Sequence, residues 1–163
     1  MAVRNRVLVV AAAAVVASIA PTVPAHADVR RFTDPRHDTS STVDILAVRV
    51  DNSTTHRNKV IVTVRQANVR FGDSITIYVD TRAKDPGPEY AIAGTTASEY
   101  LMRHQERWSG YGKPIPFQCG YRLRIHQRTD ATRAVIPRHC LGDPGRVRVA
   151  VKAVRGQPPT SRD

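Results

Sequence analysis

Residues 121–138 read YRLRIHQRTDATRAVIPR and carry the clearest strand pattern of the chain. Its first half alternates Tyr121, Leu123 and Ile125 with basic side chains, which is the period of a strand with one buried and one solvated face. The polar link RTDA then turns the chain, and the run TRAVIPR forms the answering strand. The stretch therefore predicts an antiparallel hairpin whose outer face carries arginines.

Short runs of the same kind recur along the chain. They are VDILAVRVD at 43–51, KVIVTVRQA at 59–67, DSITIYVD at 73–80, YAIAG at 90–94 and GRVRVAVKAV at 145–154. Residues 96–107 fit either a strand or a helix, because Thr96 and Glu99 have capping-box spacing, and their shortness favours the strand. About eight strands with almost no helical periodicity predict an all-β fold, an antiparallel jelly-roll-like β-sandwich, with a small β-barrel as the alternative.

The first residues predict a secretory signal peptide. Arg4 and Arg6 form a positive start, an apolar stretch runs from Val7 to Ala20, and Ala25-His26-Ala27 offers small residues before a cleavage point. We expect cleavage after Ala27 and a secreted product, extracellular or associated with the cell wall, with no membrane span in the mature chain. An uncleaved N-terminal anchor is the alternative.

The mature chain then divides into three parts. Residues 28–42 are polar, carry Pro35 and lack periodicity, so they predict an irregular N-terminal arm. Residues 43–155 contain the strand patterns and form the predicted β-sandwich domain, and residues 156–163 form a flexible tail. The mature chain that remains after cleavage, residues 28–163, is long enough for one domain with a core of ordinary size.

The chain is strongly basic, with 25 Lys and Arg against 14 Asp and Glu. Because the leader holds two arginines and no acid, the mature chain keeps 23 basic and 14 acidic side chains, a formal net charge of +9. Such a charge favours anionic partners. For an exported protein, the expected partner is a cell-wall polymer or an acidic polysaccharide, and specific binding of nucleic acid is not expected. The alternative is that the arginine excess reflects a GC-rich genome.

Two cysteines, Cys119 and Cys140, flank the hairpin. In an oxidising compartment such a pair is normally a disulfide. A metal site would have to recruit His126 or His139 without the usual ligand spacing, and a redox role would require a Cys-x-x-Cys motif. We therefore expect a Cys119–Cys140 disulfide, with no metal ion and no cofactor.

The runs VDILAVRVDN, KVIVTVRQANV, DSITIYVDT and CGYRLRI, with the closing IPRHCLGDPGRVRVAVK, resemble small secreted actinobacterial β-sandwich proteins over nearly the whole mature chain. That resemblance implies no activity. The segment DPRHDTSSTVDI followed by paired strands is more distantly similar to the jelly rolls of carbohydrate-binding modules. Fold likeness of this kind does not fix function.

The distant resemblance implies that acidic loops could hold calcium. The oxygen donors would be Asp34, Asp38 and Asp44, or Asp80, Asp85 and Glu89. Calcium needs six to eight oxygen ligands, whereas Arg82 and Lys84 interrupt the second group. Solvated turn carboxylates that balance nearby arginines are the favoured interpretation.

Motifs of the common enzyme classes are absent from the sequence. It contains no nucleophile elbow, no H-E-x-x-H helix, no P-loop and no dinucleotide fingerprint. Glu89, Glu99 and Glu106 are the only glutamates, and their spacing does not bring two of them together as a glycosidase pair. We predict no catalytic residues.

The function that the sequence favours is a secreted, non-catalytic binding domain for an anionic cell-envelope polymer or a glycan. Trp108 and Tyr111 in RWSGYGKP are the predicted stacking residues. The predicted charged face comprises Arg122, Arg124, Arg146 and Arg148, with Arg133 and Lys152 beside them. The alternative is a structural or interaction protein of the envelope with no small ligand, in which the arginines only maintain solubility and Trp108 closes the core. The two hypotheses differ in whether the aromatic and basic residues share a surface.

Overall fold

A computed structural model of the chain describes residues 29–36, 43–53, 58–108, 110 and 112–156. It contains nine strands: β1 Val29–Thr33, β2 Ile45–Asp51, β3 Lys59–Gln66, β4 Ser74–Asp80, β5 Tyr90–Thr95, β6 Tyr100–His104, β7 Arg122–His126, β8 Ala131–Pro137 and β9 Arg148–Val154. Three short 3-10 helices accompany them: η2 Phe117–Cys119, η3 Gln127–Thr129 and η4 Arg138–Leu141. The predicted signal peptide lies outside the described residues.

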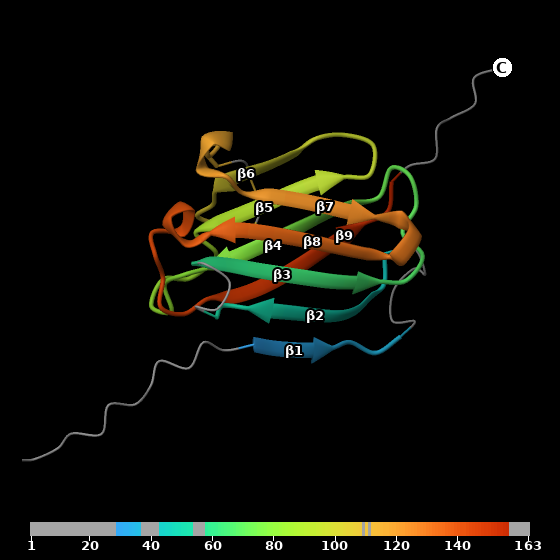
Figure 1. Cartoon of the computed structure of the whole chain (residues 1–163), viewed down its shortest axis with the longest axis horizontal. Coiled ribbons are helices and arrows are strands. Elements are labelled where there is room, and N and C mark those ends of the chain that lie inside the picture. Colours follow the sequence, from blue (N-terminus) through green and yellow to red (C-terminus); the bar gives the residue numbers. More distant parts are fainter. Residues whose placement is uncertain (1–28, 37–42, 54–57, 109, 111, 157–163) are drawn as a thin grey trace, which may run out of the picture.

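The strands form two antiparallel sheets packed face to face (Figure 1). The five-stranded sheet has the order β1-β2-β3-β8-β7, and the four-stranded sheet has the order β6-β5-β4-β9. This confirms the predicted β-sandwich and not the barrel. The order β2-β3-β8-β7 opposite β6-β5-β4-β9 corresponds to the A-B-E-D and C″-C′-C-F sheets of an immunoglobulin-type sandwich.

Alternating apolar residues of the central strands fill the space between the sheets. On β3 and β4 these residues are Val60, Val62, Val64, Ile75, Ile77 and Val79, each at most 2% exposed. Leu123, Ala134 and Ile136 of the hairpin belong to the same cluster. Each fully buried aliphatic side chain contributes roughly 1.5–3 kcal/mol, so this alternation fixes which face of every strand points outward.

The irregular arm predicted for residues 28–42 is wrong for Val29–Thr33, which form strand β1. This strand pairs with β2 from Val29 opposite Asp51 to Thr33 opposite Ala47. All five of its side chains are exposed, so the backbone ladder holds the strand without a buried face. Because neither face is buried, the sequence shows no apolar alternation there.

Residues 96–107 contain strand β6 and no helix, as the favoured interpretation predicted. Met102 is fully buried and pairs with Ile92 of β5. The Thr96 hydroxyl donates to the Arg70 carbonyl oxygen at 3.0 Å, and both Thr96 and Glu99 lie between β5 and β6, so they cap no helix.

The end of the described chain is tied to the sandwich. The backbone N–H of Gly156 donates to Asp73 Oδ1 at 3.0 Å, and a Cβ at Gly156 would come within 2.2 Å of the Gly72 carbonyl carbon. Asp73 Oδ2 also accepts the N–H of Arg70 at 2.9 Å. Gly156, predicted to begin the flexible tail, therefore belongs to the packed domain, and the rest of that tail lies outside the described residues.

Candidate functional site

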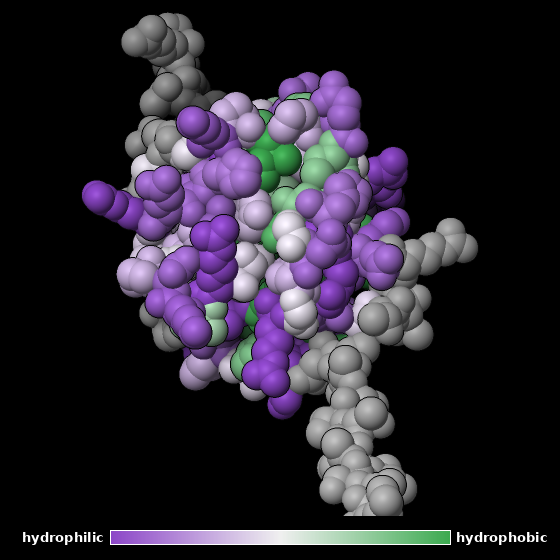
Figure 2. Space-filling view, turned by 90° about the vertical axis from the view of Figure 1, so that its left-hand side faces the viewer, coloured by the Kyte–Doolittle hydropathy of each residue, from purple (hydrophilic) through white to green (hydrophobic). Residues whose placement is uncertain are grey.

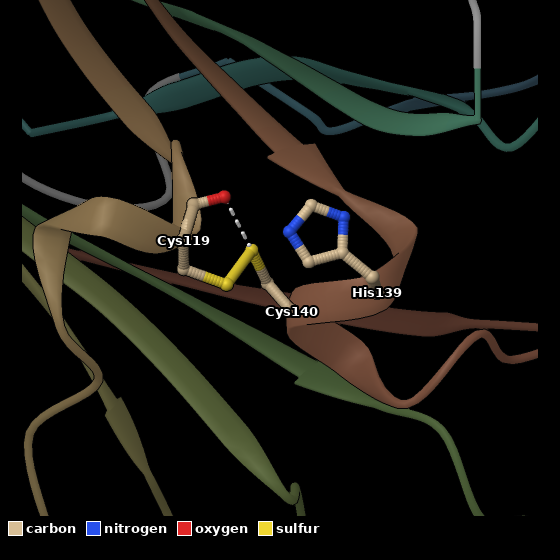
Figure 3. A group of neighbouring side chains, drawn as sticks. All are labelled: Cys119, His139 and Cys140. Atoms are coloured by element: carbon tan, nitrogen blue, oxygen red, sulfur yellow. Dashed lines mark hydrogen bonds between the residues drawn. A yellow bond between two sulfur atoms is a disulfide. The ribbon is translucent and has the colours of Figure 1, made fainter.

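The predicted disulfide joins Cys119 of η2 to Cys140 of η4 (Figure 3), with an S–S distance of 2.00 Å and a Cα–Cα distance of 5.8 Å. His139 lies beside it, and one ligand atom from each of the three residues falls within 4.8 Å of the others. Both sulfur atoms are bonded to each other, so neither is available as a thiolate ligand while the disulfide is intact. The contact of 2.9 Å between Cys140 Sγ and the Cys119 carbonyl oxygen is likewise a packing contact, because a disulfide sulfur carries no proton.

The structure divides the other predicted site residues between the two outer faces of the sandwich. Arg122 and Arg124 are exposed on β7, in the five-stranded sheet. Arg148 begins β9 in the four-stranded sheet and lines a surface hollow together with Trp108. Arg146 is exposed just before β9, and Tyr111 lies outside the described residues. A single face that joins the aromatic residue to all four arginines is therefore not formed.

Four arginines lie in one line across the outer face of the five-stranded sheet. In strand order, the directly paired residues are Arg31, Arg49, Thr63, Arg133 and Arg124. Thr63 sits between the fully buried Val62 and Val64, so this line points away from the core. We call Arg31, Arg49, Arg133 and Arg124 the arginine row. Neighbouring strands lie about 4.8 Å apart, so the row spans roughly 19 Å.

The rows on either side add further positive charge to this face. One contains Arg122 and the other contains Arg65, both exposed. A carboxylate, Asp51, lies in the first of these rows opposite Ile61, and its side chain is only 2% exposed. The strand residues of this outer face therefore include six arginines but only one aspartate, which is buried.

The arginine row places like charges directly opposite each other. Arg31 is paired with Arg49, and Arg124 is paired with Arg133. Directly opposed like charges on a sheet destabilise it. Within the described part of the chain, Arg31, Arg124 and Arg133 form no ion pair with a carboxylate, while Arg49 lies 3.5 Å from Asp51. The arrangement leaves a cationic surface that a bound anion would neutralise.

The three acids of the second group considered for calcium, Asp80, Asp85 and Glu89, are engaged within the protein. Asp80 accepts the Arg82 N–H at 3.1 Å and forms an ion pair with Arg148. Glu89 accepts the N–H and the hydroxyl of Thr81 at 2.6 and 3.1 Å. Asp85 lies 3.5 Å from Arg82. Asp38, of the first predicted group, lies outside the described residues.

Tyr90, the first residue of β5, has a pKa that is shifted by its surroundings. Burial raises its pKa above the ordinary value of 10.0, the charge of Arg82 lowers it, and the charge of Glu89 raises it. Its ring lies 5.2 Å from that of His104. Figure 2 shows the end of the sandwich that lies on the left in Figure 1, where hydrophilic side chains cover most of the view and a narrow hydrophobic strip runs between them.

Arg31, Arg49 and Arg65 are the residues of the basic face that the sequence did not single out. Arg49 and Arg65 alternate with apolar neighbours, which indicates an outward direction but not which strands will be adjacent. Arg31 lies in the segment predicted to be irregular. Only the strand order brings these arginines beside Arg124 and Arg133.

The fold and these surfaces define an antiparallel β-sandwich domain with a basic outer face. Protein-family models, curated proteins and solved structures were compared with the chain, and none of them matches it. No helix among the described residues is long and apolar enough to cross a membrane.

Proposed function

We propose that this protein is a secreted, non-catalytic binding domain that holds a linear anionic polymer of the cell envelope along the arginine row. The predicted signal peptide supports an extracellular setting, and the Cys119–Cys140 disulfide is of the kind that oxidising compartments maintain. The observation that carries the proposal is the line of four exposed arginines across five strands.

The spacing of the row favours a polymer over a single small anion. The pairs Arg31/Arg49 and Arg124/Arg133 lie at the two ends of the row, with their midpoints three strand spacings apart, or roughly 14 Å. Each pair can clamp one phosphate or carboxylate, because a guanidinium presents donors in a fork that matches either group. A chain with repeated anionic groups can occupy both clamps at once, and a single phosphate cannot.

The rigidity of the sheet supports the same function. Arg49, Arg133 and Arg124 stand on strands whose opposite faces are packed into the core, so their backbone positions are fixed before a ligand arrives. The paired arginines repel each other in the free protein, and a bound anion would offset that repulsion.

The test compares two variants of equal net charge. The row variant carries Arg31→Gln, Arg49→Gln, Arg124→Gln and Arg133→Gln. The control carries Arg70→Gln, Arg107→Gln, Arg128→Gln and Arg155→Gln, four exposed arginines outside the strands of the five-stranded sheet. The probe is long-chain polyphosphate, followed by purified cell wall, with affinity measured by calorimetry.

Four exposed contacts of about 0.7 kcal/mol each amount to about 2.8 kcal/mol, so the row variant is expected to bind about 100-fold more weakly. The control is expected to stay within about threefold of the unaltered protein. Equal losses in both variants would show that net charge alone attracts the polymer. Absence of binding by the unaltered protein at low ionic strength would favour the structural-protein alternative.

A further inference from the structure

The side of the sandwich opposite the arginine row carries an exposed aromatic platform. Trp108 is 55% exposed, and its ring meets that of Tyr78 edge to face at 5.4 Å between centroids. Tyr78 stands on the outer face of β4, between the buried Ile77 and Val79. Trp108 therefore lies over the four-stranded sheet and does not close the core.

Side-chain hydrogen bonds hold this platform in place. The Tyr78 hydroxyl donates to the Trp108 carbonyl oxygen at 3.0 Å. The amide of Gln105, a residue only 5% exposed, donates to the carbonyl oxygens of Arg107 at 2.6 Å and Gly110 at 3.3 Å. These bonds hold the backbone on either side of Trp108, and the edge-to-face contact with Tyr78 positions the exposed ring. Exposed indole held in this way is suited to stacking on a ligand.

Hollows lie on both sides of Trp108. The first has a volume of about 660 Å³, and Tyr78, Val149 and Ala150 are among its lining residues. The second has a volume of about 490 Å³ and extends over the small side chains of Thr76, Ala91 and Ala93 on β4 and β5. Both volumes fall within the range of roughly 300–1,000 Å³ typical of small-molecule sites. Because Trp108 lines both hollows, a chain-like ligand can pass over it from one to the other.

The polar groups of the first hollow carry both signs of charge. Asp80 and Arg148 are paired directly across β4 and β9 and form an ion pair, while Lys84 and Asp85 lie on the wall. The charges of these two acids and two bases cancel, so the hollow has no net charge that would attract an ion. It offers carboxylate acceptors and cationic donors side by side, which is what a ligand rich in hydroxyl groups can use.

The wall of this hollow is stiff. Pro86 and Pro88 flank Gly87, whose φ of +106° is a conformation that other residues rarely adopt. A Cβ at Gly87 would lie 3.2 Å from the carbonyl oxygen of Glu106, so the wall also packs closely against the segment that leads to Trp108. Wall and platform are therefore positioned together before a ligand binds.

We propose that this face is a second binding site, for an uncharged glycan chain. One sugar ring stacks its apolar face on the Trp108 indole, its hydroxyl groups bond to Asp80 and Arg148, and the neighbouring sugars lie in the second hollow. The site does not rest on the arginine row, because the two lie on opposite outer faces of the sandwich. Together they would let one domain hold a glycan and an anionic polymer at the same time.

The test uses the fact that Trp108 is the only tryptophan of the chain, so intrinsic tryptophan fluorescence reports on this site alone. The full mature protein is titrated with neutral cello-, xylo-, manno- and chito-oligosaccharides of four to six sugars, with calorimetry as the second readout. At least one series is expected to shift the emission with saturation, and the affinity is expected to change little between low and high salt.

The matched variants are Trp108→Ala, Trp108→Phe and, as a control, Phe71→Ala, which removes an aromatic ring that is 69% exposed elsewhere. By calorimetry, Trp108→Ala is expected to weaken binding at least about tenfold, Trp108→Phe to retain part of it, and Phe71→Ala to leave it unchanged. The arginine-row variant should bind the oligosaccharide normally, which separates this proposal from the previous one. A panel that produces no emission change at millimolar concentration would overturn the proposal, and so would oligosaccharide binding that survives Trp108→Ala.

Discussion

Replacing Arg124 by glutamate turns a repulsive cross-strand pair into an attractive one. Arg124 lies directly opposite Arg133 on the outer face of the five-stranded sheet, and both are exposed. Two like charges directly opposite each other destabilise the sheet, and two opposite charges stabilise it, each by roughly 0.2–1 kcal/mol. R124E removes a repulsion and adds an attraction. We therefore expect its free energy of unfolding to exceed that of a variant whose new glutamate has no opposed arginine by about 0.4–2 kcal/mol.

Arg122 provides that reference on the same strand and the same face. It is exposed and lies opposite Val135, so R122E makes the same change of charge without a directly opposed arginine. The assay is urea unfolding followed by circular dichroism, at low and at high salt. The stability difference between R124E and R122E should shrink in high salt, because exposed charges are screened.

The double variant R124E/R133E again places two like charges opposite each other, so it should lose the extra stability of R124E. Equal stability of R124E and R122E at low salt would refute the idea that the row carries an electrostatic cost. If the idea holds, R124E should combine higher stability with weaker polyphosphate binding, a trade-off expected where residues are placed for a ligand.

Three further outcomes are expected. Removing the disulfide by C119A/C140A should lower the free energy of unfolding by about 3 kcal/mol in the chain-entropy model, and thiol labelling of the native secreted protein should find no free cysteine. Because the pKa of Tyr90 is raised in the folded protein, its contribution to stability is present below pH 10.0 and is lost as pH rises through the folded-state value. Y90F should make the alkaline loss of stability shallower in unfolding experiments, and an unchanged profile would contradict that assignment. N-terminal sequencing of the secreted protein should begin at Asp28, and a start that includes the Val7 to Ala20 run would instead mean an anchor.

The sheet faces and the disulfide could be predicted from the sequence because their signals are local. Alternation in residues 73–80 and 121–127 assigned Ile77 and Leu123 to the core, as the structure confirms. The disulfide followed from two isolated cysteines, and η2 and η4 bring them together. Strand β1 was missed because an edge strand with both faces exposed has no apolar period to detect.

The candidate site could be predicted only in part, because neighbouring strands are not sequence neighbours. Arg124 and Arg133 belong to one hairpin, so their proximity follows from local pairing. Arg49 joins them only because β3 lies between β2 and β8. The same strand order sends Arg148 to the other sheet, although it has the same alternating context as Arg124. Residue alternation predicts which face of the sheet a side chain is on, and the strand order determines which side chains are its neighbours there.

The proposed binding by the arginine row is measured by the dependence of polyphosphate affinity on salt, since that dependence counts the phosphates that the protein neutralises. With two clamps that each neutralise one phosphate, and with the coefficient of about 0.7 per phosphate known for single-stranded nucleic acids, a plot of log affinity against log salt should have a slope of about −1.4. This slope is expected for the unaltered protein and for the control that lacks Arg70, Arg107, Arg128 and Arg155, whereas the row variant should have a slope near zero. A row variant that keeps the full slope would show that cations elsewhere on the protein hold the polymer, and would rule out the arginine row as its binding site.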